Sequence, residues 1–286
     1  MPAAEIDVTT ELVRDLIRQQ HPDLLGPLLL VANGWDNVIF RLGDTRTVRL
    51  PRRQIAAELI SKEQRWLPRL APVLPLAIPV PERVGNPNQD YPWSWSIGPW
   101  FDGDSLTTIA VADRTRYAAD LAAFFTELHR PAPADAPVNP VRGIPLSSRA
   151  ALVTEHLQAL GASEEIKRLW EELLATPVHA GPPVWVHGDP HPANILIKDD
   201  RLAAMIDFGD LCAGDPATDL AVAWLAFDDL GRQHFRDRYV AINGNDPDLW
   251  RRARGWALSL GLSLLANSDD NPMLAAIGDH ALEQVG

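Results

Sequence analysis

The sequence predicts an α+β fold with two lobes, a strand-rich part at residues 1–102 and a mainly helical part at residues 103–286. Short apolar runs separated by turn residues fill the first part, which is typical of an antiparallel sheet. Apolar residues at helical spacing dominate the second part. One hairpin pattern, within residues 184–210, interrupts the helices and carries the residues that suggest chemistry.

The first part is predicted to begin with a helix and three strands. Thr9 or Thr10 can cap a helix whose apolar residues share one face. Apolar runs then predict strands at residues 28–31, 38–42 and 47–50. A polar loop separates the first two strands, and a glycine-aspartate turn separates the last two.

A further helix and two more strands complete the first part. The helix is expected at residues 55–70, and the proline-dense sequence that starts at Pro68 favours an extended connection after it. Strands are expected at residues 80–84 and 93–100. Tryptophan and serine alternate in the second of these strands, so its tryptophans share one face and are expected to pack in the core.

The second part is predicted to consist of helices joined by loops. Residues 113–128 have helical spacing, and His129 at their end is expected to cap or pack rather than catalyse. Proline-rich residues 131–145 are expected to form a loop between helices. Ser163 opens another helix, and Asp219 is expected to begin a buried helix in a mainly structural role.

The hairpin within residues 184–210 is expected to bring the candidate catalytic and metal-binding residues together. Two short apolar runs flank a polar turn at residues 198–201, and a hairpin returns its ends to the same place. Asp189, Asn194 and Asp207 are therefore expected to converge. Two carboxylates and an amide oxygen suit Mg²⁺ carrying substrate phosphates. A carboxylate left free of metal can accept a proton from an attacking hydroxyl.

The motif HGDPHPAN at residues 187–194, followed by IDFGD at residues 206–210, resembles the catalytic loop and metal motif of protein kinases. With His-Gly-Asp, and Asn five residues after the Asp, it is more similar to the aminoglycoside phosphotransferase family of antibiotic kinases. The resemblance implies a protein-kinase-like fold with a hinge near Asp102. It also implies transfer of the γ-phosphoryl group of ATP or GTP to a hydroxyl of an aminoglycoside-like or other small polar acceptor, with Mg²⁺ as cofactor.

The resemblance assigns roles to the residues of these two motifs. Asp189 takes the position of the catalytic base, and His191 falls where protein kinases place a lysine that faces the transferred phosphoryl group. Asn194 and Asp207 take the positions of the two Mg²⁺ ligands. The family also resembles kinases of choline, homoserine, fructosamine and macrolides, so the fold does not identify the acceptor.

Two segments of the first part are expected to contact the nucleotide. The loop that contains Asn33, Gly34 and Asn37 lies where kinase-like folds cover the phosphates, although an ordinary turn explains one glycine equally well. Pro99 and Trp100 belong to the expected hinge, whose backbone groups would bind adenine. The sequence contains neither a P-loop motif nor a Rossmann fingerprint.

The third strand departs from the usual kinase pattern. Arg49 stands where a lysine normally contacts the α- and β-phosphates. Arginine can bind phosphate through two donors, but its geometry differs from that of lysine; a surface role among the neighbouring arginines is the alternative. The expected partner on the following helix is Glu63, with Glu58 as the other candidate.

Two alternative functions stay open. A metallohydrolase would use His187, Asp189 and His191 as alternating ligands. Such alternation needs an extended strand, which Pro190 and Pro192 disfavour. A nucleotide-binding pseudokinase that acts as an interaction module is the second alternative, and the intact kinase motifs argue against it.

The composition and the net charge limit the classes of binding partner. A hydrophobic fraction of 46% and a charged fraction of 22% are typical of a soluble globular protein. The net charge of −12 argues against nucleic acid or an anionic membrane as partner; it is compatible with a cationic acceptor, although acidity more often serves solubility. The single cysteine, Cys212, excludes an intrachain disulfide. Without a signal peptide or a membrane-length apolar run, the expected location is the cytoplasm.

Overall fold

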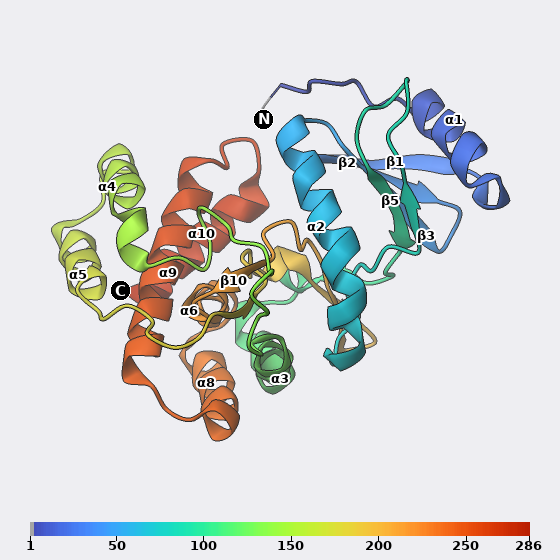
Figure 1. Ribbon diagram of the computed structural model, residues 1–286. Coiled ribbons are helices and arrows are strands. Elements are labelled where there is room, and N and C mark those ends of the chain that lie inside the picture. The colour runs from blue at the N-terminus through green and yellow to red at the C-terminus, as the bar shows by residue number, and fades with distance from the viewer. Residues whose placement is uncertain (1–2) are drawn as a thin grey trace. The chain divides into compact units, whose positions relative to one another are not determined.

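The computed structural model describes residues 3–286 and divides into two compact units (Figure 1). The N-terminal unit comprises the residues up to Pro72 together with Ala77–Asp102 and Asp207–Gly209. The C-terminal unit comprises Val73–Leu76, Gly103–Ile206 and Asp210–Gly286. None of the described helices is long and apolar enough to cross a membrane.

The N-terminal unit is built on a five-stranded antiparallel sheet in the order β1-β2-β3-β5-β4. Its strands are β1 (Leu28–Asn33), β2 (Asn37–Leu42), β3 (Arg46–Pro51), β4 (Arg83–Gly85) and β5 (Trp95–Pro99). Helix α1 (Thr10–Gln20) contacts β1, whereas α2 (Gln54–Leu70) contacts β3 and β5.

The core of this unit follows from the alternation along its strands. Val38, Phe40 and Leu42 of β2 are buried and alternate with half-buried neighbours, the period of two expected of a strand. They belong to one apolar cluster with Leu16 and Ile17 of α1. Burying each such side chain contributes about 1.5–3 kcal/mol, so the amphipathic faces of helix and sheet hold each other in place.

Two tryptophans, Trp93 just before β5 and Trp95 at its start, pack in the core, as predicted. Trp93 and Trp95 are 7% and 0% exposed. The indole of Trp95 lies directly over Gly85 on the neighbouring strand, since a β-carbon on that glycine would lie 1.8 Å from the ring. A glycine is therefore required at this position of β4.

One prediction about the proline-dense stretch is wrong. The strand expected at residues 80–84 is only the short β4, because Pro79 and Pro81 flank Val80 and have no N–H to donate to a sheet. The end of the preceding helix is as predicted, since α2 continues past Pro68 to Leu70. A proline in the last turn of a helix removes one hydrogen bond, and three buried residues, Trp66, Leu67 and Leu70, keep this turn packed.

The C-terminal unit consists mainly of helices (Figure 1). They are α3 (Ala118–Leu128), α4 (Ala150–Ala159), α5 (Glu164–Leu174), α6 (Ala217–Leu220), α7 (Val222–Ala226), α8 (Asp229–Asn243), α9 (Pro247–Ala266) and α10 (Pro272–Val285). Helix α9 contacts α4, α5, α6, α7 and α10, so it is the central helix of the unit. Helix α3 packs mainly on α8.

Two small antiparallel sheets accompany these helices. Strand β6 (Asp104–Ser105) pairs with β8 (Ile195–Lys198), which pairs with β9 (Arg201–Met205). Strand β7 (Val184–Val186) pairs with β10 (Cys212–Gly214). The predicted hairpin is thus β8–β9, and Lys198 faces Arg201 across its two-residue turn.

The helix ends largely agree with the sequence. The hydroxyl oxygens of Thr9 and Ser163 accept hydrogen bonds from backbone N–H groups of the first turns of α1 and α5, at 3.2 and 3.3 Å, so both predicted caps are confirmed. His129 ends α3 and is buried, which agrees with a packed histidine. The start of this helix was predicted too early, because residues 111–117 form a 3₁₀ helix and α3 begins at Ala118.

Candidate active site

The predicted catalytic loop, residues 187–194, lies between β7 and β8 in the C-terminal unit. Asp219 of α6 is fully buried and anchors the start of this loop. Its carboxylate accepts hydrogen bonds from the backbone N–H groups of His187 at 2.7 Å and Gly188 at 2.9 Å. His129 lies 3.2 Å from the same carboxylate. Asp219 is structural, as predicted, but α6 already begins at Ala217, and the Asp219 side chain holds the loop instead of capping the helix.

Asp189 is the partly exposed carboxylate of this loop. Its Oδ2 lies 3.3 Å from His191 Nε2 and accepts a hydrogen bond from Asn194 Nδ2 at 3.2 Å. Its Oδ1 faces Arg142 Nη2 at 3.9 Å, and 30% of the side chain is exposed. One carboxylate oxygen is thus held by the loop, and the other is directed away from it.

The charge of Asp189 is set by its neighbours. Burial alone would raise the pKa of Asp189, but His191 and Arg142 outweigh it and hold the pKa below its ordinary range. The carboxylate is therefore ionised at neutral pH. In this state it can accept a hydrogen bond from a hydroxyl group and orient it.

Asn194 has a side chain suited to a hard cation. Its amide Nδ2 is used for Asp189, with a second hydrogen bond to the Asp189 carbonyl at 3.1 Å. This leaves the amide oxygen for another partner. An oxygen ligand of this kind fits Mg²⁺.

Asp207 belongs to the N-terminal unit and has an unusual backbone. Its φ angle of 63° lies in the left-handed region, which residues other than glycine rarely adopt and which is enriched at functional sites. Asp207 follows Ile206, whose N–H donates to the Asn194 carbonyl at 2.9 Å. The carboxylate of Asp207 interacts electrostatically with Arg49 and Glu63 of its own unit.

Arg49 and Glu63 form the ion pair that the sequence predicted. Arg49 Nη1 lies 2.7 Å from Glu63 Oε2, and the side chains are 14% and 2% exposed. Glu58, the other candidate, is exposed. Burial lowers the pKa of Arg49, but the charges of Glu63 and Asp207 raise it above its ordinary value, so Arg49 stays charged.

The loop between β1 and β2 is held by arginines that the sequence analysis did not assign to it. Gly34 closes the loop by donating its N–H to the Asn37 carbonyl at 2.9 Å. Arg52 donates to the Gly34 carbonyl at 2.8 Å, and Arg53 pairs with Asp36 at 2.6 Å. Asn33 is exposed at the end of β1. These arginines follow Arg49 closely in the sequence. No periodicity there distinguishes arginines that hold the loop from arginines on the surface.

The two predicted hinge residues already make hydrogen bonds through their backbones. Trp100 donates its N–H to the Thr45 carbonyl at 2.8 Å, and the Pro99 carbonyl accepts from the Thr47 hydroxyl at 3.2 Å. The guanidinium of Arg41 lies 4.6 Å from the centre of the Trp100 ring. An adenine contact at this position stays a prediction.

A connector that the sequence analysis treated as a simple loop contributes two polar residues to the catalytic loop's surroundings. Asn139 donates to Asp210 Oδ1 at 2.8 Å. Arg142 lies between Asp210 and Asp189, with its Nε 3.4 Å from Asp210 Oδ2. Both lie within the proline-rich residues 131–145. The only signal in the sequence is the presence of polar residues among the prolines.

The geometry argues against the metallohydrolase alternative. His187 Nε2 lies 3.0 Å from the Ile206 carbonyl, and His191 pairs with Asp189. Throughout residues 3–286, no group of three or more histidine, cysteine, aspartate or glutamate side chains is arranged to hold a metal ion. The three proposed ligands therefore do not form a common metal site.

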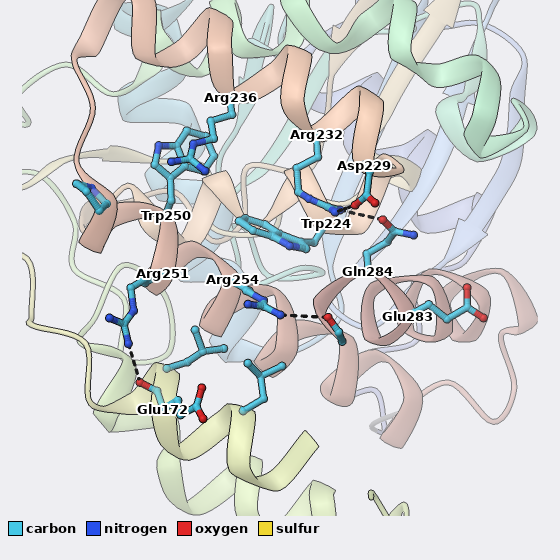
Figure 2. A pocket seen from close by; sticks show the side chains of 14 residues that line it. Glu172, Trp224, Asp229, Arg232, Arg236, Trp250, Arg251, Arg254, Glu283 and Gln284 are labelled. Atoms are coloured by element: carbon cyan, nitrogen blue, oxygen red, sulfur yellow. Dashed lines mark hydrogen bonds and ion pairs between the residues drawn. The ribbon is translucent and has the colours of Figure 1, made fainter. Parts of the chain in front are cut away.

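A cavity of about 730 Å³ lies elsewhere in the C-terminal unit and contains none of the predicted catalytic residues (Figure 2). Several arginines line it and close the ends of helices. Arg251 donates to the Glu172 carbonyl of α5 at 3.4 Å, and Arg254 donates to the Val285 carbonyl of α10 at 3.0 Å. Cations at helix C-termini are stabilising, so these arginines have a structural explanation.

A model of the phosphotransferase enzyme family matches residues 28–256 of the chain. Comparison with curated proteins gives no match.

Solved structures of antibiotic kinases share the fold. The GDP complex of wild-type aminoglycoside 2'-phosphotransferase-IIIa has a TM-score of 0.71 at 20% identity, covering 97% of this chain and 99% of that chain. Apo macrolide 2'-phosphotransferase MphH from Brachybacterium faecium has a TM-score of 0.64 at 21% identity, covering 95% and 97%. The streptomycin-ATP ternary complex of APH(2")-IIa has a TM-score of 0.61 at 20% identity, covering 98% of each chain. The predicted fold class is thereby confirmed.

Proposed function

The chain belongs to the phosphotransferase enzyme family, and from this premise we propose that it transfers the γ-phosphoryl group of ATP or GTP to a hydroxyl of a small polar acceptor. The observation that carries the proposal is the state of Asp189. It is an ionised, partly exposed carboxylate with one oxygen held by His191 and Asn194. The other oxygen is left to receive a hydroxyl.

In the proposed reaction, the acceptor hydroxyl donates a hydrogen bond to Asp189. Its oxygen attacks the γ-phosphorus, and the bond to the β–γ bridging oxygen breaks as ADP or GDP leaves. The hydroxyl proton passes to the Asp189 carboxylate. Because this carboxylate has a lowered pKa, it is a weak base, and its main contribution is to position the nucleophile. His191 keeps the carboxylate oriented.

Mg²⁺ would be held by the amide oxygen of Asn194 and the carboxylate of Asp207. Both are hard oxygen donors, and Mg²⁺ usually takes its remaining ligands from water and substrate phosphates. When bound, the ion would neutralise part of the phosphate charge. Asn194 is oriented for this role by Asp189, which engages its amide nitrogen.

The N-terminal part, residues 1–102, is proposed to bind the nucleotide. Arg49, held by Glu63, would contact the phosphates, and the loop containing Asn33, Gly34 and Asn37 would cover them. Pro99 and Trp100 would lie beside the base. The GDP and ATP named in the related structures support a nucleoside triphosphate as donor.

The C-terminal part, residues 103–286, is proposed to bind the acceptor. Related structures contain kanamycin and streptomycin, which are hydroxylated antibiotics. An antibiotic acceptor would make the protein a resistance enzyme. The supply of nucleoside triphosphates favours the cytoplasm as its location.

Two variants of the motifs test this function. Asp189→Asn keeps the shape of the side chain but removes its charge, so acceptor phosphorylation should fall by about 10²–10⁴-fold, while Mg-ATP affinity changes little. Asp207→Ala should weaken Mg-dependent ATP binding as well as turnover. Calorimetry gives the ATP affinity, and acceptor-dependent ADP release gives the turnover.

The outcomes separate the alternatives. Normal phosphorylation by Asp189→Asn would contradict the assignment of Asp189. A pseudokinase would bind Mg-ATP but release no ADP with any acceptor in a panel of aminoglycosides, macrolides and small alcohols. Retained Mg-ATP binding by Asp207→Ala would remove that residue from the proposed metal site.

A further inference from the structure

Arg142 adjoins the oxygen of Asp189 that remains for an acceptor. Its Nη2 is 3.9 Å from Asp189 Oδ1, and its Nε is 3.4 Å from Asp210 Oδ2. Only 17% of the Arg142 side chain is exposed. His191 and Asn194 engage the opposite oxygen of Asp189, so a hydroxyl that reaches this carboxylate arrives beside Arg142.

The backbone around Arg142 is held firmly in place. The N–H of Asp215 donates to the Gly143 carbonyl at 2.9 Å, and the N–H of Gly143 donates to the Thr218 hydroxyl at 3.1 Å. Gly143 has a φ of +66°. A β-carbon on Gly214 would lie 2.2 Å from the carbonyl oxygen of Gly143. This close glycine contact anchors the connector against β10 and fixes where Arg142 emerges.

The guanidinium of Arg142 has N–H groups that make no short hydrogen bond. Its Nη1 donates to the Val141 carbonyl at 3.4 Å, which is a long hydrogen bond. Its Nε is buried and has no hydrogen-bond partner among the residues that the structure describes. The distances to Asp189 and Asp210 are those of ion pairs rather than of good hydrogen bonds. Such a group favours an additional acceptor of hydrogen bonds.

A second arginine makes the surroundings more positive. Arg149 is 6% exposed, and burial followed by the nearby charge of Arg142 lowers its pKa, although Asp210 acts in the opposite direction. Asp210 already accepts a hydrogen bond from Asn139 at 2.8 Å. An acceptor ammonium would therefore meet protein cations here, beside the carboxylates of Asp189 and Asp210, which are already paired with Arg142. A carboxylate or phosphate would meet unsatisfied donors.

We propose that Arg142 determines acceptor specificity by binding an anionic group, a carboxylate or a phosphate, that the acceptor carries close to its reacting hydroxyl. The inference rests on the proposed kinase function and specifies its acceptor class. It gives the opposite expectation to the net charge of −12, because nearby arginines act on the acceptor more strongly than screened charges on the distant surface.

Three probes with the same carbon chain test the proposal: 3-hydroxypropanoate, 1,3-propanediol and 3-amino-1-propanol. Their binding is measured by calorimetry with Mg²⁺ and a non-hydrolysable ATP analogue present. Wild-type protein should bind the anionic probe at least about tenfold more tightly than the amine, as one charge-assisted hydrogen bond predicts. Arg142→Gln should lose about 10–100-fold in affinity for the anionic probe alone, and Arg142→Lys should retain part of the preference. Arg238→Gln, an exposed position on α8, should change nothing.

The outcomes distinguish this proposal from the function on which it rests. Amine binding as tight as anion binding, no binding of the anionic probe, or loss of the preference in Arg142→Lys as complete as in Arg142→Gln would overturn the role of Arg142. ADP release with ATP is measured on the same probes. Preferential binding of the anion without ADP release would support Arg142 and contradict the kinase function. ADP release together with a preference for the amine would support the kinase function and contradict the role of Arg142.

Discussion

Arg49 and Glu63 form a buried ion pair whose value lies in function more than in stability. Removing two charges from water costs several kcal/mol for each ion, and the attraction between them only partly offsets that cost. The pair nevertheless joins β3 to α2, and Asp207 is near enough to raise the pKa of Arg49. A fixed guanidinium of this kind suits a phosphate-bearing ligand.

We expect Arg49→Ala to weaken Mg-ATP affinity by about 10–100-fold, because a charge-assisted contact to phosphate is lost. Arg49→Lys should retain more affinity, since an ammonium still meets phosphate as a point charge. The matched control is Arg46→Ala on the same strand, whose exposed pair with Glu82 contributes little. Calorimetry measures all three variants, and unchanged affinity in both Arg49 variants would leave this residue a structural role only.

The β8–β9 hairpin shows how local chemistry shapes an element. Its two-residue turn has positive φ at both Asp199 and Asp200, 50° and 58°, as a type I′ turn requires. Glycine adopts this conformation without the steric cost that a β-carbon imposes. The turn is therefore strained, and a glycine in it would relieve the strain without changing the fold.

Asp200→Gly should raise the free energy of unfolding by about 0.5–1 kcal/mol, measured by urea denaturation. The exposed pair between Arg116 and Asp200, at 3.4 Å, contributes little and is lost at little cost. Asp200→Ala loses the same pair but keeps the strained β-carbon, so it should not stabilise the protein. Equal stabilisation by both variants would show that the turn strain is not the cause.

At the scale of the whole molecule, the chain consists of two compact units, and we propose a separate ligand for each. The charged pair and the covering loop proposed for the nucleotide belong to the N-terminal unit, and the catalytic loop belongs to the C-terminal unit. A ligand that binds only the folded state stabilises it by an amount set by its concentration and affinity.

Mg²⁺ with a non-hydrolysable ATP analogue, at a hundred times its Kd, should therefore raise the free energy of unfolding by about 2.7 kcal/mol. In hydrogen–deuterium exchange, the nucleotide should protect residues 33–37 and β3 most strongly, because they carry the proposed phosphate contacts. Helices α4 and α5 serve as the internal reference and should exchange unchanged. Protection confined to α4 and α5 would contradict the proposal that the N-terminal unit binds the nucleotide.

The sequence by itself determined the features that depend on neighbours along the chain. Helix starts at Thr9 or Thr10 and at Ser163 were predicted because a cap acts within one turn, and β8–β9 was predicted because apolar runs flank a polar turn. The alternation of tryptophan and serine from residue 93 predicted that Trp93 and Trp95 are buried. The motifs at residues 187–194 and 206–210 together predicted the family and fold, since their residues lie at a spacing that the chemistry requires, and the family model confirms the family.

Only the tertiary structure decided the contacts that join distant parts of the chain. It selected Glu63 over Glu58 as the partner of Arg49, because burial rather than helix position separates the two glutamates. It also brought Arg142 from a proline-rich connector to Asp189, through the close packing of Gly143 on β10. No periodic pattern encodes such a contact, because it depends on where two separately formed segments meet.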